Sequence, residues 1–220
     1  MHRFHDRRDA GRRLAAALQH LKGLDLVVLA LPRGGVPVAA EIASALDGEL
    51  DVLLVRKLGL PAEPELAMGA IADAPEPIIV RNETELYAAH VPKAAFDAVV
   101  AKERAELARR RRLYVGGRRH AAIEGRVVIL VDDGIATGAT VRAAIAALKA
   151  MKPARLVLAV PVAAPDTAAE LARDVDELVC LETPHPFGAI GYFYDDFAQV
   201  ADAEVIDTLA RFDRRRGTAP

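Results

Sequence analysis

Continuous apolar runs alternate along this chain with stretches in which apolar residues recur every three or four positions. Runs without polar interruption are typical of strands buried on both faces, and residues 127–131 (Val-Val-Ile-Leu-Val) form the clearest one. The predicted strands are 26–31, 52–55, 78–80, 127–131, 155–162 and 175–181. The predicted helices are 7–22, 36–46, 93–114, one that carries Val141, Ile145 and Leu148 on one face, and 165–173. This alternation predicts an α/β fold with a doubly wound, mostly parallel sheet flanked by helices.

The length of 220 residues fits one substantial domain with a real hydrophobic core. A hydrophobic content of 52% argues against disorder. We therefore expect a single domain over residues 1–213, followed by a frayed basic tail over 214–220 that begins with three arginines.

Charge and cysteine content limit the environment of the protein. The formal net charge of −2 gives no general attraction to nucleic acid or to an anionic membrane. The arginine run 109–112 lies on a predicted helix with acids nearby, so we interpret it as a solvated face rather than a nucleic-acid contact. The single cysteine, Cys180, excludes an intramolecular disulfide. No apolar run approaches the ~20 residues of a membrane span, and the N-terminus lacks an apolar signal core, so we expect a cytoplasmic protein.

The strand over 127–131 is followed by an acidic pair. It runs into Asp132 and Asp133, and a loop of small and hydroxyl residues leads from there to a helix that opens near Gly138. Carboxylates at a strand end suit ribose hydroxyls or a hydrated cation, and a helix N-terminus suits a phosphate. The stretch therefore predicts a site for a ribose 5-phosphate. The alternative is an acidic pair that caps the next helix.

Two other predicted strands end in cationic groups. The first is followed by Arg33-Gly34-Gly35, where glycines let backbone amides approach an anion and the guanidinium matches phosphate oxygens. The strand over 52–55 is followed by Arg56 and Lys57. Because ligands of such sheets bind beyond the carboxyl ends of the strands, both groups predict contacts to a pyrophosphate. An ordinary turn and a solvated cation pair are the alternatives.

Two segments outside these strands are candidates for covering the site. Residues 59–76 mix glycine, proline and acids and could form a flap, although Met68–Ala72 reads equally as a strand of a flanking hairpin. Half of the aromatic residues lie within 184–198, where they could stack on a planar acceptor. The alternative, which we prefer slightly, is a small satellite core.

The stretch Asp132-Asp133-Gly134-Ile135-Ala136-Thr137-Gly138-Ala139-Thr140 resembles the phosphoribosyl-pyrophosphate motif of the type I phosphoribosyltransferases, and Arg33-Gly34-Gly35 resembles their pyrophosphate loop. The resemblance is specific over residues 26–58 and 126–162. It implies a type I phosphoribosyltransferase-like fold with a small flap or hood region, and a cis peptide bond at Pro32–Arg33. It also implies that the two acids bind the ribose hydroxyls, and that the 5′-phosphate is cradled by Ala136, Thr137, Gly138, Ala139 and Thr140. The hypoxanthine-guanine branch has an aspartate where this chain has Ala136, so that acceptor assignment does not carry over.

We therefore predict a magnesium-dependent phosphoribosyltransferase of nucleotide metabolism. It would move ribose 5-phosphate from phosphoribosyl pyrophosphate to an unidentified nitrogen acceptor, such as a nucleobase, and release pyrophosphate. The predicted catalytic residues are Asp132, Asp133, Arg33 and Lys57, with Arg56, Gly34 and Gly35 as further substrate-binding residues. Mg²⁺ is the predicted cofactor, and any contact of the two aspartates with it would pass through water.

Two other functions compete with this prediction, and the number of subunits stays open, with a homodimer as one option. A regulatory protein could bind phosphoribosyl pyrophosphate without transfer, although retention of Arg33 and Lys57 argues against it. A receiver-like signalling domain would need acids at the end of the first strand, where this chain has Pro32-Arg33.

Overall fold

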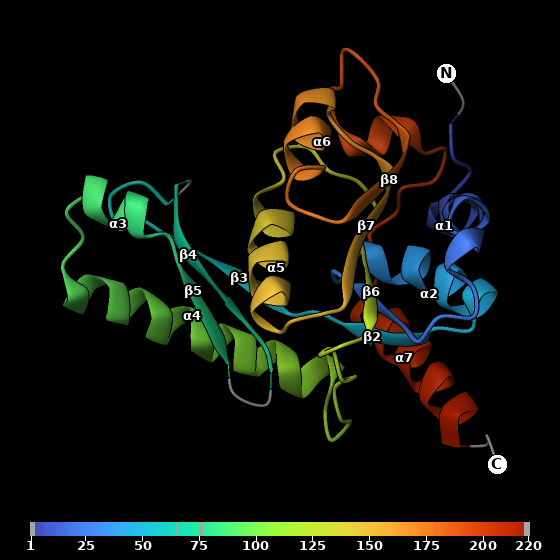
Figure 1. The fold of residues 1–220 in the computed structure, drawn as a ribbon, viewed down its shortest axis with the longest axis horizontal. Helices are drawn as coiled ribbons and strands as arrows, with labels where there is room; N and C mark the ends of the chain where they lie inside the picture. Colours follow the sequence, from blue (N-terminus) through green and yellow to red (C-terminus); the bar gives the residue numbers. More distant parts are fainter. Residues whose placement is uncertain (1–2, 65, 75–76, 218–220) are drawn as a thin grey trace. The chain divides into compact units, whose positions relative to one another are not determined.

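The computed structural model describes residues 3–64, 66–74 and 77–217, and these fall into two compact units. Unit 1 comprises Met1–Val52, Ala121–Gly138 and Lys152–Pro220, whereas unit 2 comprises Leu53–His120 and Ala139–Met151. Each unit has its own sheet (Figure 1). None of the helices formed by the described residues combines the length and the apolar character that a bilayer crossing requires.

Unit 1 contains a five-stranded parallel sheet in the order β2-β1-β6-β7-β8. Its elements are α1 (Arg7–Ala17), η1 (Gln19–Leu21), β1 (Leu26–Ala30), α2 (Gly35–Leu46), β2 (Glu49–Val52), β6 (Val127–Val131), β7 (Arg155–Val162), α6 (Pro165–Leu171), β8 (Glu177–Glu182), η2 (Ile190–Phe193) and α7 (Asp202–Gly217). The predicted α/β architecture with a mostly parallel sheet flanked by helices is confirmed.

The core of unit 1 lies around the two central strands. Every residue of β1 is buried, and so are four of the five residues of β6. In these uninterrupted apolar strands both faces are covered, as the sequence pattern predicts. Helices α1 and α2 lie side by side against one face of the sheet (Figure 1). Gly11 permits this close approach, because a Cβ atom there would lie 2.7 Å from the carbonyl oxygen of Val38.

Unit 2 contains a three-stranded antiparallel sheet in the order β3-β4-β5. Its elements are β3 (Val55–Gly59), β4 (Ala67–Ala72), β5 (Ile78–Arg81), α3 (Glu83–Ala88), α4 (Lys93–Tyr114) and α5 (Ala139–Ala150). Helix α4 runs along this sheet, and α5 also contacts it (Figure 1). Phe96, Leu107 and Tyr114 of α4 are buried, as its apolar spacing predicts.

The predicted strand over 52–55 is wrong. The parallel strand β2 already ends at Val52, and β3 begins at Val55 in the antiparallel sheet. The apolar run from Leu50 to Val55 contains no turn residue that marks the change of sheet. Its one polar residue, Asp51, is buried, and its carboxylate accepts hydrogen bonds from the backbone amides of Val52 (2.8 Å) and Ala121 (2.9 Å).

The structure tests two further predictions, about the segment 59–76 and about the C-terminal tail. Met68–Ala72 lies within β4, which pairs with both β3 and β5, so the hairpin interpretation of this part of 59–76 is confirmed. Glu65, Pro75 and Glu76 of that segment lie outside the described residues. The frayed tail is wrong for residues 214–217, because α7 continues to Gly217, and residues 218–220 lie outside the described part.

Candidate functional site

Two loops meet at the carboxyl ends of the paired strands β1 and β6. The backbone amide of Leu31 donates to the carbonyl oxygen of Val131 (2.9 Å), which extends the pairing into the loops. A Cβ atom on Gly35 would lie 2.6 Å from that same carbonyl oxygen, and one on Gly34 would collide with the Asp133 carboxylate. Only glycine therefore allows the loop after β1 to lie against the loop after β6. Arg33-Gly34-Gly35 and Asp132-Asp133 thus form one continuous surface in unit 1.

Arg33 lies at the outer side of this surface. The Pro32–Arg33 peptide bond is cis, as the family resemblance implies. The guanidinium Nη1 of Arg33 lies 3.5 Å from Oδ1 of Asp202, at the start of α7, and about one third of the Arg33 side chain is exposed. This weak, partly solvated ion pair leaves the guanidinium accessible to an anionic ligand.

Three hydrogen bonds hold Asp133 in place. Its carboxylate Oδ2 accepts a hydrogen bond from Nε of Arg7 at 2.7 Å, and its backbone carbonyl accepts one from the Tyr194 hydroxyl at 2.6 Å. Its own amide donates to Oδ1 of Asp132 at 2.9 Å. Only 9% of the residue is exposed. The orientation of Asp133 is therefore fixed before any ligand binds.

The pKa values of Asp132 and Asp133 are both raised. Burial, together with the neighbouring charge of Asp133, raises the pKa of Asp132 well above its usual value. Burial also raises the pKa of Asp133, although the hydrogen bond and charge of Arg7 oppose that rise. Burial raises the pKa of the Tyr194 hydroxyl, which therefore stays protonated and remains a donor. An acidic pair that is only partly compensated in this way attracts hydroxyl donors or a hydrated cation.

The loop after Asp133 is anchored at its start and exposed at its tip. The amide of Ile135 donates to the carbonyl of Val162 (2.9 Å), and the Thr167 hydroxyl donates to the carbonyl of Ala136 (2.8 Å). Gly138 has a φ of +73°, which suits glycine and turns the chain toward α5. Ala136 and Thr137 are exposed, so their polar groups can meet a ligand. Ala139 and Thr140 form the first turn of α5, in unit 2.

Arg56 and Lys57 do not follow a strand of the parallel sheet, and this part of the prediction is wrong. Both lie inside β3 of unit 2, opposite Ile71 and Ala70 of β4. Nε of Arg56 donates to Oε2 of Glu103 at 2.7 Å, and the Glu103 side chain is largely buried. Their contact with a pyrophosphate stays a prediction.

The aromatic residues of 184–198 pack mainly on one another. Phe193 and Tyr194 are buried in a cluster with Phe4, and Phe187 and Phe197 are partly buried against it. The satellite-core interpretation is confirmed for these side chains. Tyr192 is the exception, with 66% of its surface exposed. A role of this segment as a hood stays a prediction.

The arginine run on α4 makes ion pairs within unit 2. Arg109 and Arg110 both donate to Glu106, at 2.8 and 2.9 Å, and together they lower the pKa of this carboxyl to about 2. Arg111 lies 3.2 Å from the buried carboxylate of Asp73. These pairs agree with the interpretation of a structural, solvated helix face.

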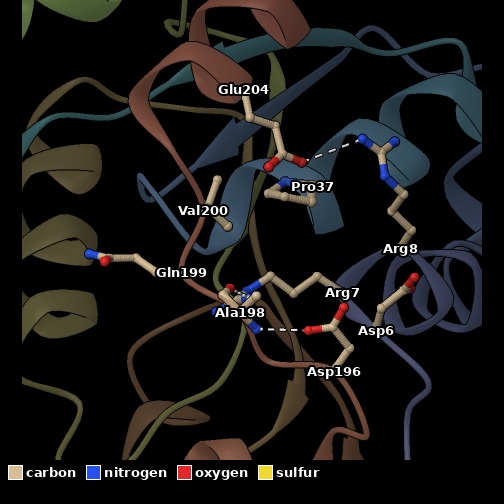
Figure 2. A pocket seen from close by; sticks show the side chains of 9 residues that line it. All are labelled: Asp6, Arg7, Arg8, Pro37, Asp196, Ala198, Gln199, Val200 and Glu204. Atoms are coloured by element: carbon tan, nitrogen blue, oxygen red, sulfur yellow. Dashed lines mark hydrogen bonds and ion pairs between the residues drawn. The ribbon is translucent and has the colours of Figure 1, made fainter.

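Three side chains at the site carry no signal in the sequence. Arg7 belongs to a charged run on an amphipathic helix, Tyr194 follows η2 in the aromatic segment, and Asp202 belongs to α7, which is absent from the predicted elements. Arg7 also lines a cavity of about 200 Å³ next to the site, with Arg8, Glu204 and six other residues (Figure 2). The positions of Arg7, Tyr194 and Asp202 at the site depend on long-range packing. Arg7 and Asp133, for example, are 126 residues apart in the chain.

The acidic pair of the site offers oxygen ligands to a metal. In the part of the chain that the structure describes, no group of three His, Cys, Asp or Glu side chains could hold a metal ion. Mg²⁺ is commonly held by one or two carboxylates, water and substrate phosphates rather than by an all-protein cage. The oxygens of Asp132 and Asp133 fit that mode of binding.

The chain is similar to known proteins over most of its length. The family model of the phosphoribosyl transferase domain matches residues 3–196. Two Mycobacterium tuberculosis proteins, provisionally named as phosphoribosyl transferases, are each 48% identical to it over 211 residues, which is 96% of this chain and 47% of theirs. The chain therefore spans about half the length of these relatives. The crystal structure of TT1426 from Thermus thermophilus superposes with a TM-score of 0.88 at 44% identity, covering 96% of this chain and 99% of that one.

Proposed function

Since the chain belongs to the phosphoribosyl transferase domain family, we propose that it moves ribose 5-phosphate from phosphoribosyl pyrophosphate to a nitrogen acceptor and releases pyrophosphate. One observation carries the proposal. The Arg33-Gly34-Gly35 loop lies directly against the Asp132-Asp133 strand end, with no room for a Cβ atom between them. A cationic loop and a carboxylate pair in contact match a sugar that bears an anionic leaving group on its anomeric carbon.

The proposed roles of these residues follow from the charges that develop on the substrate as it reacts. Breaking the bond at the anomeric carbon leaves positive charge on the ribose and adds negative charge to the departing pyrophosphate. Asp132 and Asp133 would bind the ribose hydroxyls and stabilise the positive ring, and Arg33 with the amide of Gly34 would stabilise the leaving group. Gly35 would act by letting the loop approach closely, because its own amide donates to the carbonyl of Leu31 at 3.0 Å. Fixed groups of this kind need no reorganisation as the charge develops.

Ala136 and Thr137, at the exposed tip of the loop, would hold the 5′-phosphate, far from the bond that breaks, and Gly138, Ala139 and Thr140 stay predicted contacts of this phosphate. Such remote contacts position the reacting carbon and supply binding energy that the reaction can use. A chain with a single cysteine suits a reducing compartment, so we also expect action in the cytoplasm.

Asp132 and Asp133 would hold Mg²⁺ through water, and the ion would supply charge neutralisation at the leaving group. Arg56 and Lys57 stay predicted contacts of the pyrophosphate. The acceptor stays unassigned, and a buried aromatic cluster in 184–198 gives no reason to favour a stacked planar base.

A screen for pyrophosphate release tests the proposal. The protein is incubated with phosphoribosyl pyrophosphate and Mg²⁺, together with purines, pyrimidines and other amines in turn. We expect acceptor-dependent release that Asp133→Asn lowers by orders of magnitude. Asp166→Asn, which changes an exposed acid in α6, is the matched control and should retain activity. Undiminished release by Asp133→Asn would refute the ribose role.

The same screen separates transfer from the regulatory alternative. A protein that binds phosphoribosyl pyrophosphate tightly but releases no pyrophosphate with any acceptor would be a binding protein. Binding measured by calorimetry alongside release distinguishes the two functions.

A further inference from the structure

Arg7 connects the first helix of the chain to the acidic pair. Its side chain makes three contacts at once: Nε donates to Oδ2 of Asp133 at 2.7 Å, Nη1 donates to the carbonyl of Ala198 at 2.7 Å, and its guanidinium carbon lies 3.8 Å from the ring centroid of Phe197. Figure 2 shows the side chain extending toward Ala198. Only 11% of the Arg7 side chain is exposed. A planar guanidinium suits all three contacts, whereas a lysine ammonium offers neither a fork of donors nor a flat face.

The surroundings of Asp133 leave its side chain no alternative place. Gly34 closes one side of the carboxylate, and Arg7 occupies Oδ2. The backbone is fixed separately, by Tyr194 at the carbonyl and Asp132 at the amide. The carboxyl of Asp132 also interacts with that of Asp133. Arg7 is the cationic contact that turns the carboxylate. A buried carboxylate without such a partner would suffer a large desolvation penalty or change its position.

We propose that Arg7 is a positioning residue of the ribose site: by holding Oδ2 of Asp133, it leaves Oδ1 as the atom that accepts from a ribose hydroxyl. This inference rests on the proposed function, because it assumes that Asp133 binds a ribose. Arg7 touches no reacting atom in this proposal and acts only through Asp133. Phe197 and Ala198, which contact Arg7, lie in the segment after η2. This segment would therefore help to position Arg7.

The test compares two ligands that use different parts of the site. Affinities for ribose 5-phosphate and for magnesium pyrophosphate are measured by calorimetry on wild type, Arg7→Met and Arg7→Lys, with thermal unfolding of each. Loss of a charge-assisted hydrogen bond at the ribose site should weaken ribose 5-phosphate binding by Arg7→Met about tenfold or more. Magnesium pyrophosphate binding should stay within about twofold, since its proposed contacts, Arg33 and the amide of Gly34, do not involve Arg7.

Two further variants sharpen the result. Arg7→Lys keeps the cation and the fold but loses the contact geometry, so we expect a smaller loss confined to ribose 5-phosphate. Arg8→Met is the matched control, because Arg8 follows on the same helix and lines the same cavity, while its ion pairs go to Glu41 and Glu204. Its affinity for both ligands should equal that of wild type.

Each outcome decides between interpretations. If the folded variants bind both ligands equally more weakly, Arg7 is merely structural. If their affinity for ribose 5-phosphate is unchanged, Arg7 does not support the ribose site. If that affinity is higher than in wild type, Arg7 blocks the site. Any of these results overturns this inference while the wild-type affinities keep the proposed function. A wild-type protein that binds neither ligand overturns the proposed function and this inference with it.

Discussion

Replacing Tyr194 by phenylalanine removes the hydroxyl that donates a hydrogen bond to the backbone carbonyl of Asp133. The Tyr194 hydroxyl donates to the Asp133 carbonyl at 2.6 Å, and only 3% of the tyrosine is exposed. The ring itself would stay packed, 5.4 Å from the ring centroid of Phe4 and 4.8 Å from that of Phe197, so no large cavity forms. The expected loss is therefore that of an unsatisfied buried carbonyl, about 1–3 kcal/mol in the free energy of unfolding.

Urea denaturation followed by circular dichroism measures this loss. Since the exposed surface of the unfolded chain does not change, the midpoint should fall while the slope of the free energy against urea stays the same. Each 1 kcal/mol corresponds to about 2–4 °C in the melting temperature of a chain of this size.

Tyr192→Phe supplies the control, because it makes the same chemical change two residues away on a side chain that is 66% exposed. Surface substitutions of this kind usually stay within about 0.5 kcal/mol. If the two variants unfold at the same urea concentration, the hydrogen bond to Asp133 contributes nothing to stability and the reasoning fails.

Three further predictions concern charge. Asp132→Asn removes a carboxyl whose pKa burial raises, so the ligand-free variant should be more stable than wild type near neutral pH. That gain should shrink as the pH falls through the raised pKa, because the carboxyl of Asp132 in the wild type then becomes protonated and neutral. A gain that does not change as the pH is lowered from neutral toward the usual pKa of an aspartate would contradict this prediction. Arg33→Ala should weaken magnesium pyrophosphate binding more than ribose 5-phosphate binding, and equal losses in calorimetry would argue against a leaving-group contact. Burial raises the pKa of the Cys180 thiol to about 11, so iodoacetamide should modify the native protein far more slowly at pH 8 than the urea-unfolded protein, and equal rates would contradict it.

The parallel sheet can be predicted because its signal is local. Each of its central strands is a continuous apolar run, and each of the two loops of the site begins where such a run ends. The predicted bounds of Val127–Val131 agree with the structure to the residue, and so do those of Lys93–Tyr114 in α4. The contact between Arg33-Gly34-Gly35 and Asp132-Asp133 follows from one rule, that parallel strands present their carboxyl ends at one edge.

Features set by tertiary contacts cannot be predicted in this way. The change of sheet after Val52 has no local marker, and the buried carboxylate of the neighbouring Asp51 accepts from an amide 70 residues away in the chain. Propensity alone gives no reason for Arg7 to reach Asp133, since a guanidinium on an amphipathic helix usually faces water. Helix α7 is absent from the predicted elements, although its buried residues Val205 and Leu209 stand four positions apart, as on one face of a helix.

The way the two units share the chain affects how the protein can be made and divided. Unit 1 is built from three stretches of sequence and unit 2 from two, so the polypeptide passes between them four times. During synthesis, unit 2 lacks α5 until residue 151 has emerged from the ribosome, and the sheet of unit 1 then still lacks β7 and β8. Neither unit corresponds to a continuous fragment that could be expressed by itself, and a truncation from either terminus to residue 120 or 138 removes elements of both.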